Sequence, residues 1–130
     1  KKDEINGEEL EYLLLERKKE RANFLLIDVR EEYEYHEKRI LGVDYLVPLS
    51  DFFNKTKELE EHKSKPIIAK CKLGGRSAQA QRQLKLMGFK KVINLSGGIS
   101  NYKGEVKRLW ISSLTPEAIK EGFNNLYRHR

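Results

Sequence analysis

Cys71 is the only cysteine of the 130-residue chain and opens the run Cys71-Lys72-Leu73-Gly74-Gly75-Arg76-Ser77. A short apolar run over residues 66–69 precedes it, and an amphipathic helical pattern follows it. This order predicts a loop between the carboxyl end of a strand and a helix N-terminus, where open parallel sheets bind ligands. The unpaired N–H groups of the helix start, the Gly-Gly turn and the adjacent cations would all favour a thiolate. We therefore predict that Cys71 is a nucleophile, assisted by three cations: Lys70, Lys72 and Arg76.

The alternative is a structural cysteine buried beside a tight turn, since free cysteines are often simply part of a core. A cysteine between two lysines, ahead of a Gly-Gly turn and a helix start, fits that role poorly. A single cysteine cannot form an internal disulfide, and with three scattered histidines it gives no metal-ligand spacing. The sequence predicts neither a metal site nor a cofactor.

Composition predicts one soluble globular domain, with 38% hydrophobic and 35% charged residues. No apolar run approaches the roughly 20 residues that span a bilayer, so no membrane partner is expected. The net charge of +6 favours anions, but no nucleic-acid motif accompanies it. No signal peptide is visible and the chain begins without Met. A cytoplasmic location is favoured, and an exported mature form stays open.

Strand and helix patterns alternate along the chain. Apolar runs predict strands over 24–29, 45–47, 66–70 and 91–95. Helical spacing predicts helices over 7–19, 51–61 and 77–87. Ser50 would cap the second of these helices, and Gly88 would end the third. Residues 31–38 are predicted to form a short polar helix or a loop. The acidic run of Glu31, Glu32 and Glu34 is interpreted as a solvated face. This alternation predicts an α/β fold whose parallel sheet has helices on both faces.

The C-terminal part of the chain has a different pattern. Residues 104–114 form the only candidate linker, and a helix is predicted over 115–126, with Thr115 as the cap. Within that helix, Ile119, Phe123 and Leu126 form an apolar stripe that must be buried. We expect a domain over 1–107 and a helical extension over 108–130. The extension would pack either on that domain or on a second copy, with a homodimer favoured.

Three segments together resemble the single-domain rhodaneses, a family of sulfurtransferases. Leu25-Leu26-Ile27-Asp28-Val29-Arg30-Glu31 resembles the family's strand with an Asp-Val-Arg signature, and the run from Cys71 to Ser77 resembles its active-site loop. The run over 95–102 resembles its Gly-Gly turn, with Tyr102 where the family usually has Trp. The chain departs from the family at Lys38-Arg39, where Gly-His is common. Arg39 would then either point to the mouth of the site or be a surface charge, which is favoured.

The resemblance implies a parallel sheet of about five strands. It implies that Cys71 takes sulfane sulfur from a small anionic donor such as thiosulfate or polysulfide, and holds it as a persulfide. The acceptor would be a thiol or cyanide, or a protein. The backbone of Lys72, Leu73, Gly74 and Gly75 would form the cradle, and Arg76 would bind the donor or shape the loop. Asp28, Arg30 and Ser77 would support this arrangement.

Two alternatives use the same fold. One is a binding or protein-to-protein sulfur-relay module with little activity toward free small molecules. The C-terminal extension supports this alternative, because it could form a surface for a partner. The other is a phosphatase or an arsenate reductase of the related families, whose loops are one residue longer from Cys to Arg. The shorter loop of this chain, from Cys71 to Arg76, suits a sulfur atom better than a tetrahedral oxyanion.

Overall fold

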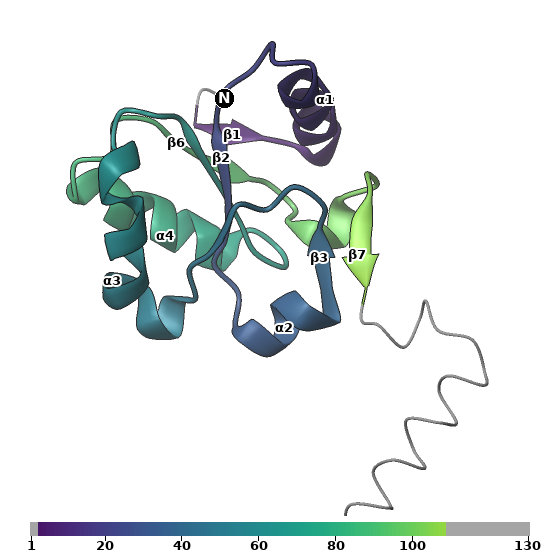
Figure 1. Cartoon of the computed structure of the whole chain (residues 1–130). Coiled ribbons are helices and arrows are strands. Elements are labelled where there is room, and N and C mark those ends of the chain that lie inside the picture. The colour runs from purple at the N-terminus through teal and green to yellow at the C-terminus, as the bar shows by residue number, and fades with distance from the viewer. Residues whose placement is uncertain (1–2, 109–130) are drawn as a thin grey trace, which may run out of the picture.

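Three four-residue strands form the centre of the fold: β2 (Leu25–Asp28), β5 (Ile67–Lys70) and β6 (Val92–Leu95). All residues of β2 and β5 are buried, as expected of strands covered on both sides. Two short strands, β1 (Glu4–Ile5) and β4 (Tyr45–Leu46), complete a parallel sheet of order β1-β6-β5-β2-β4. The computed structural model describes residues 3–108, and over them the predicted α/β fold with a five-stranded parallel sheet is confirmed (Figure 1).

Helices cover both faces of this sheet (Figure 1). On one face, α3 (Phe52–Lys55) and α4 (Gly75–Leu86) pack with Ile27 and other odd-numbered residues of β2 in one hydrophobic cluster. On the other, α1 (Gly7–Lys18) packs with Leu26 in a second cluster. Neighbouring residues of β2 enter different clusters because successive side chains of a strand point to opposite faces.

A two-stranded antiparallel sheet lies beside the main one. It pairs β3 (Lys38–Ile40), which directly follows the short helix α2 (Glu32–Glu37), with β7 (Val106–Arg108). The prediction of a linker over 104–114 was therefore wrong for residues 106–108. β7 hydrogen-bonds along β3 because the two segments, far apart in sequence, meet at the edge of the domain (Figure 1).

The other predicted elements within the described residues agree with the structure except around residues 50–61. Residues 51–61 form α3 between two 3-10 helices, Leu49–Asp51 and Thr56–His62, instead of one α-helix. Ser50 caps no helix there, because its hydroxyl donates to Glu31 Oε1 at 2.6 Å. The helix predicted over 115–126 lies outside the described residues. Between residues 3 and 108, no helix has both the length and the hydropathy to cross a membrane.

Candidate active site

Cys71 directly follows β5, and the chain turns within three residues into α4. Gly74 makes this turn with φ +115°, a conformation that residues with a side chain rarely adopt. The turn brings two backbone N–H groups and one hydroxyl of the helix start to the sulfur. Cys71 Sγ accepts from the Gly74 N–H at 3.0 Å and from the Ser77 N–H at 3.4 Å, and Ser77 Oγ lies 3.3 Å away. The predicted strand–loop–helix cradle is present around this thiol.

The cradle changes the acidity of the thiol. Cys71 is only 1% exposed, and burial by itself would raise its pKa because a buried charge loses hydration. Hydrogen bonds to the sulfur act in the opposite direction; they come from the Ser77 hydroxyl, when its proton faces Cys71, and from the N–H groups of Ser77, Gly74 and Leu73. The balance lowers the pKa of Cys71 below its ordinary value, which favours the nucleophilic thiolate.

Asp28, Arg30 and Lys70 form a buried ionic cluster under the loop. Lys70 Nζ lies 3.0 Å from Asp28 Oδ2, and Arg30 Nη2 lies 2.9 Å from the same oxygen. Arg30 also donates to the Lys38 carbonyl at 2.6 Å, so the cluster connects β5, β2 and β3. Burial lowers the pKa of Lys70 to about 8, against the opposing attraction of Asp28. Lys70 is therefore not the free cation at the loop that its sequence position suggested.

Arg76 is held by Glu34, which the sequence analysis assigned to a solvated face. Its Nη1 and Nη2 donate to the two carboxylate oxygens of Glu34 in α2, at 2.8 and 2.9 Å. The hydrogen bond from Arg76 lowers the pKa of Glu34 to about 2, although partial burial opposes this change. The side chain of Glu34 is only 13% exposed, so the prediction that Glu34 belongs to a solvated acidic face was wrong. The pair fixes Arg76 at the rim of the loop.

The remaining loop residues are exposed. Lys72 and Gly75 face solvent, and Leu73 keeps 68% of its surface accessible. Arg39 stacks on the ring of Tyr35, 4.6 Å from the ring centroid, and donates to the Tyr35 carbonyl. Arg39 is thus packed on α2.

The Gly97-Gly98 turn after β6 fixes the loop from the opposite side. The Ile99 N–H donates to the Cys71 carbonyl at 2.9 Å, and the Ser100 N–H donates to the Lys72 carbonyl at 3.1 Å. These bonds bring the two backbones so close that a Cβ on Gly98 would lie 2.4 Å from the carbonyl carbon of Lys72. Glycine is needed at this position because a side chain would displace the loop.

Asn94, in β6, is a site residue that sequence analysis missed. Its Oδ1 accepts from Ser77 Oγ at 2.5 Å, and its Nδ2 donates to the Gly74 carbonyl at 3.2 Å. Asn94 is 5% exposed, and a buried amide in an otherwise apolar strand was the signal that could have identified it. It connects the sheet to the two residues that contact the sulfur.

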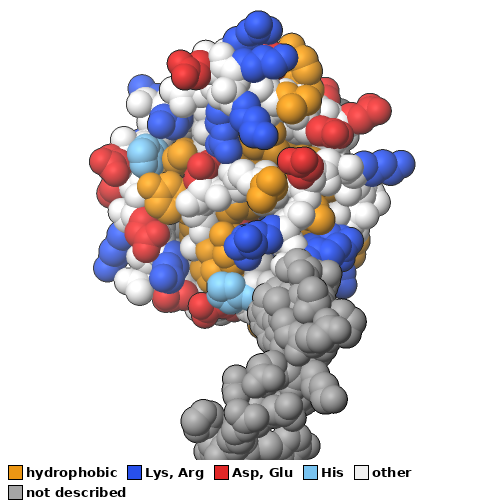
Figure 2. All heavy atoms as spheres, turned by 45° about the vertical axis from the view of Figure 1, so that its right-hand side comes forward, with side chains coloured by type: hydrophobic (Ala, Val, Ile, Leu, Met, Phe, Trp, Pro, Cys, Tyr) orange, Lys and Arg blue, Asp and Glu red, His pale blue; other side chains and the backbone are white. Residues whose placement is uncertain are grey.

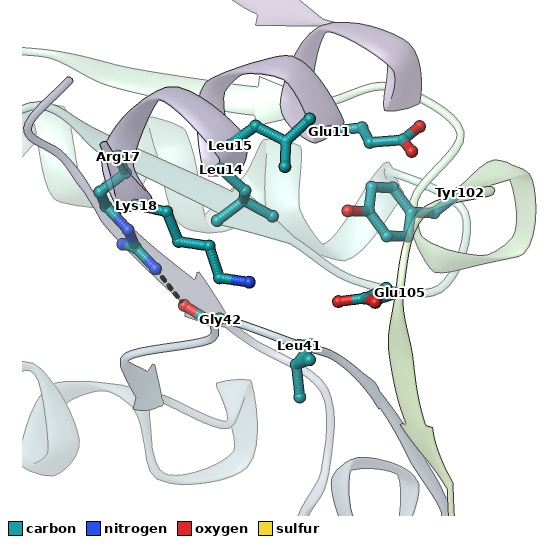
Figure 3. A pocket seen from close by; sticks show the side chains of 9 residues that line it. All are labelled: Glu11, Leu14, Leu15, Arg17, Lys18, Leu41, Gly42, Tyr102 and Glu105. Atoms are coloured by element: carbon teal, nitrogen blue, oxygen red, sulfur yellow. Dashed lines mark hydrogen bonds between the residues drawn. The ribbon is translucent and has the colours of Figure 1, made fainter. Parts of the chain in front are cut away.

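The pocket that Figure 3 shows is not formed by the loop. Within the described part of the chain, no group of three or more His, Cys, Asp or Glu could hold a metal ion. A pocket of about 400 Å³ lies between α1, the Leu41-Gly42 turn, Tyr102 and Glu105. Figure 3 shows that its walls carry leucines and both signs of charge, and none of the predicted site residues lines it.

Comparisons with solved structures agree on the fold. The rhodanese-like domain of the Alr3790 protein from Anabaena sp. superposes with a TM-score of 0.71 at 24% identity, over 89% of this chain and 86% of that chain. A thiosulfate sulfurtransferase from Pseudomonas aeruginosa superposes with a TM-score of 0.68 at 26% identity, over 82% of this chain and 20% of that one.

Curated relatives match part of their own length. YrkF of Bacillus subtilis (strain 168), whose name proposes a sulfur carrier protein, is 39% identical over 63% of this chain and 43% of the relative. A tRNA uridine(34) hydroxylase of Acinetobacter baumannii (strain AYE) is 36% identical over 69% of this chain and 31% of the relative. The chain thus spans less than half of these two relatives. A family model described as the rhodanese-like domain matches residues 11–105, and the chain belongs to this family.

Proposed function

We propose that this domain is a sulfurtransferase in which Cys71 carries sulfane sulfur as a persulfide. The observation that carries the proposal is the position of Cys71 Sγ, which accepts from the N–H groups of Gly74 and Ser77 at the start of α4. Such a cradle stabilises a negative sulfur, whether it is the attacking thiolate or the terminal sulfur of a persulfide.

The reaction is a double displacement on sulfur. With thiosulfate as the donor, the Cys71 thiolate attacks the outer sulfur and forms an S–S bond, while the bond to the sulfite group breaks. Sulfite leaves with the electron pair of that bond, and the enzyme retains a cysteine persulfide. An acceptor thiolate or cyanide then attacks the terminal sulfur, and Cys71 leaves as the thiolate. Neither step requires a metal or an organic cofactor.

The loop supports sulfur transfer over phosphate or arsenate chemistry. It is one residue shorter from Cys71 to Arg76 than the loops of the related phosphatases and arsenate reductases, and both terminal nitrogens of Arg76 are held by Glu34. The family and the names of two similar proteins, a proposed sulfur carrier and a thiosulfate sulfurtransferase, support the same chemistry. Thiosulfate or polysulfide as the donor is our proposal for this chain.

A protein acceptor is the second candidate, and it is favoured by the apolar rim of the site. Leu73, in the loop itself, is 68% exposed, and Tyr33, next to the Arg76 partner Glu34 in α2, is 73% exposed. Exposed apolar side chains beside a reactive group are typical of contact surfaces. On the face shown in Figure 2, basic and acidic side chains are interspersed, so no continuous basic surface there favours a nucleic acid.

The test is the intact mass of the protein after exposure to thiosulfate and, in a separate arm, to polysulfide. Wild type should gain one sulfur atom, and Cys71→Ser should gain none, because a serine hydroxyl cannot form a persulfide. Sulfur loaded onto wild type should then be released by cyanide or by a protein thiol, and the faster release identifies the acceptor class. A mass gain that persists in Cys71→Ser would contradict the assignment of the nucleophile, and no gain in wild type would contradict the function.

A further inference from the structure

The hydroxyl of Ser77 has one proton and three acceptors around it. Ser77 Oγ lies 2.5 Å from Asn94 Oδ1, 3.3 Å from Cys71 Sγ and 3.3 Å from the Gly74 carbonyl oxygen. A hydroxyl can donate to one acceptor at a time, and the shortest contact takes the proton. The Ser77 proton therefore belongs to Asn94 in this arrangement, and Ser77 turns a lone pair toward the sulfur.

The orientation of the Asn94 amide is fixed by its other partner. Nδ2 donates to the Gly74 carbonyl at 3.2 Å, and exchanging the two ends of the amide would bring Oδ1 against that carbonyl oxygen. Asn94 is 5% exposed, so the amide has little access to water as a substitute partner. Its oxygen is thus held facing Ser77.

This arrangement distinguishes the two protonation states of Cys71. As a thiol, Cys71 can donate its S–H to Ser77 Oγ. The Ser77 hydroxyl then donates to Asn94 Oδ1, and Asn94 Nδ2 donates to the Gly74 carbonyl, so each of these groups has a hydrogen-bond partner. As a thiolate, Cys71 needs the Ser77 proton for itself. Turning that proton to the sulfur would leave two oxygens facing each other at 2.5 Å without a hydrogen between them.

We propose that Asn94 is a positioning residue that holds the Ser77 proton away from the sulfur and thereby stabilises the thiol form of Cys71. It acts against the backbone N–H groups of the cradle, which stabilise the thiolate. The inference deepens the proposed function, since it concerns the state of the same nucleophile. It is independent of which donor is used.

The other charges that act on Cys71 must stay constant in any test. These are Lys70, bonded to Asp28, and Arg76, bonded to Glu34. Replacing Asn94 or Ser77 changes neither charge, so differences among such variants report on the hydrogen-bond chain. Asn94→Leu is the preferred change because leucine has nearly the same shape and no polar atom.

The measurement is the rate of Cys71 alkylation as a function of pH, with the absorbance of the thiolate as a second readout. In Asn94→Leu, Ser77 is free to donate to the sulfur, and the midpoint of the profile should fall by about one pH unit. A lower midpoint means faster alkylation near neutral pH. If Asn94 merely kept the loop folded, its replacement would instead make alkylation slower. A midpoint that is unchanged or higher would overturn the proposal.

The control is Ser77→Ala, alone and combined with Asn94→Leu. Without the Ser77 hydroxyl, Asn94→Leu should no longer move the midpoint, because the effect passes through that proton. An equal fall in both backgrounds would also overturn the proposal. Should Asn94→Leu not fold, Asn94→Ala is measured in the same two backgrounds with the same criteria. Alkylation needs no sulfur donor, so this result is separate from the persulfide mass test.

Discussion

The ion pair between Arg76 and Glu34 places two opposite charges beside the nucleophile, and each can be removed separately. Arg76→Ala should weaken the use of an anionic donor and move the Cys71 alkylation profile to higher pH, because the cation favours the thiolate. Glu34→Gln should have the opposite effects: it should strengthen the use of an anionic donor and move the Cys71 alkylation profile to lower pH. Since Arg76 is 37% exposed, we expect roughly two- to fivefold changes in KM for thiosulfate.

Steady-state kinetics and a pH profile of alkylation measure these effects. Arg76→Lys serves as a matched variant, because it keeps the charge and loses the two-point contact with Glu34. If Arg76→Ala and Glu34→Gln move KM in the same direction, the pair acts through the structure of the loop and its charge is not used.

The buried Lys70 predicts a dependence of stability on pH. Burial holds its folded pKa at about 8, below the 10.5 of an exposed lysine. Between these values the unfolded chain binds more protons than the folded one, so the free energy of unfolding rises with pH. Lys70→Met should abolish this rise and should fold stably at neutral pH, since Asp28 keeps Arg30 as its partner.

Chemical denaturation between pH 8 and pH 10 tests this prediction. The thiol must be removed first, because the lowered pKa of Cys71 contributes a rise of the same sign. We therefore compare Cys71→Ser with Cys71→Ser/Lys70→Met. The scan stops at pH 10 because burial raises the pKa of Tyr102 to about 12, which lowers stability in more alkaline solution. Parallel curves for the two proteins would contradict the assignment to Lys70.

At the scale of elements, the turn after β6 positions the loop as much as β5 and α4 do. Gly98→Ala should destabilise the domain by about 1–3 kcal/mol and slow persulfide formation, because φ is +56° and a Cβ would lie 2.4 Å from the carbonyl carbon of Lys72. Gly75→Ala is the matched control, since an added Cβ there meets nothing within 4 Å in the described residues and α4 begins at that position.

Thermal unfolding and the mass test measure both variants. Gly75→Ala should change stability little, or raise it slightly, because alanine favours a helix over glycine. Equal behaviour of the two variants would show that the contact between the 97–101 turn and the loop is not required.

Elements with a strong local pattern were predictable, and those made by distant pairing were not. β2 and β5 are continuous apolar runs, and α4 carries Ala80 and Leu84 at helical spacing. β3 has only three residues, two of them basic, and it exists because it pairs with β7 from the other end of the domain. No local periodicity in Lys38–Ile40 encodes that partner.

The same distinction applies to the site. The loop from Cys71 to Ser77 is contiguous in sequence, so its cradle could be derived from the strand before it and the helix after it. Glu34 and Asn94 reach the loop from α2 and β6. Glu34 looks ordinary within an acidic run, and Asn94 differs from its segment only as one polar residue in an apolar strand. Their roles follow from tertiary contacts that one sequence alone does not encode.

For the whole molecule, the prediction concerns residues 109–130. The described residues 3–108 contain two hydrophobic clusters, one on each face of the sheet. The apolar stripe Ile119, Phe123 and Leu126 in the sequence nevertheless needs a partner surface. We predict that it packs on the domain or on a second copy, with a homodimer favoured.

Ending the chain after Arg108 keeps β7 intact and removes that stripe. The shortened chain should still form a persulfide at Cys71, because every contact described around the sulfur comes from residues 71–77 and β6. Light scattering should then show either the loss of a dimer or, for a monomer, a lower thermal midpoint than that of the full chain. Replacing Phe123 by Ser in the full chain should have the same effect, since the stripe acts through its buried surface. If the full and shortened chains are monomers of equal thermal stability, the stripe is not buried in this protein and the prediction is wrong.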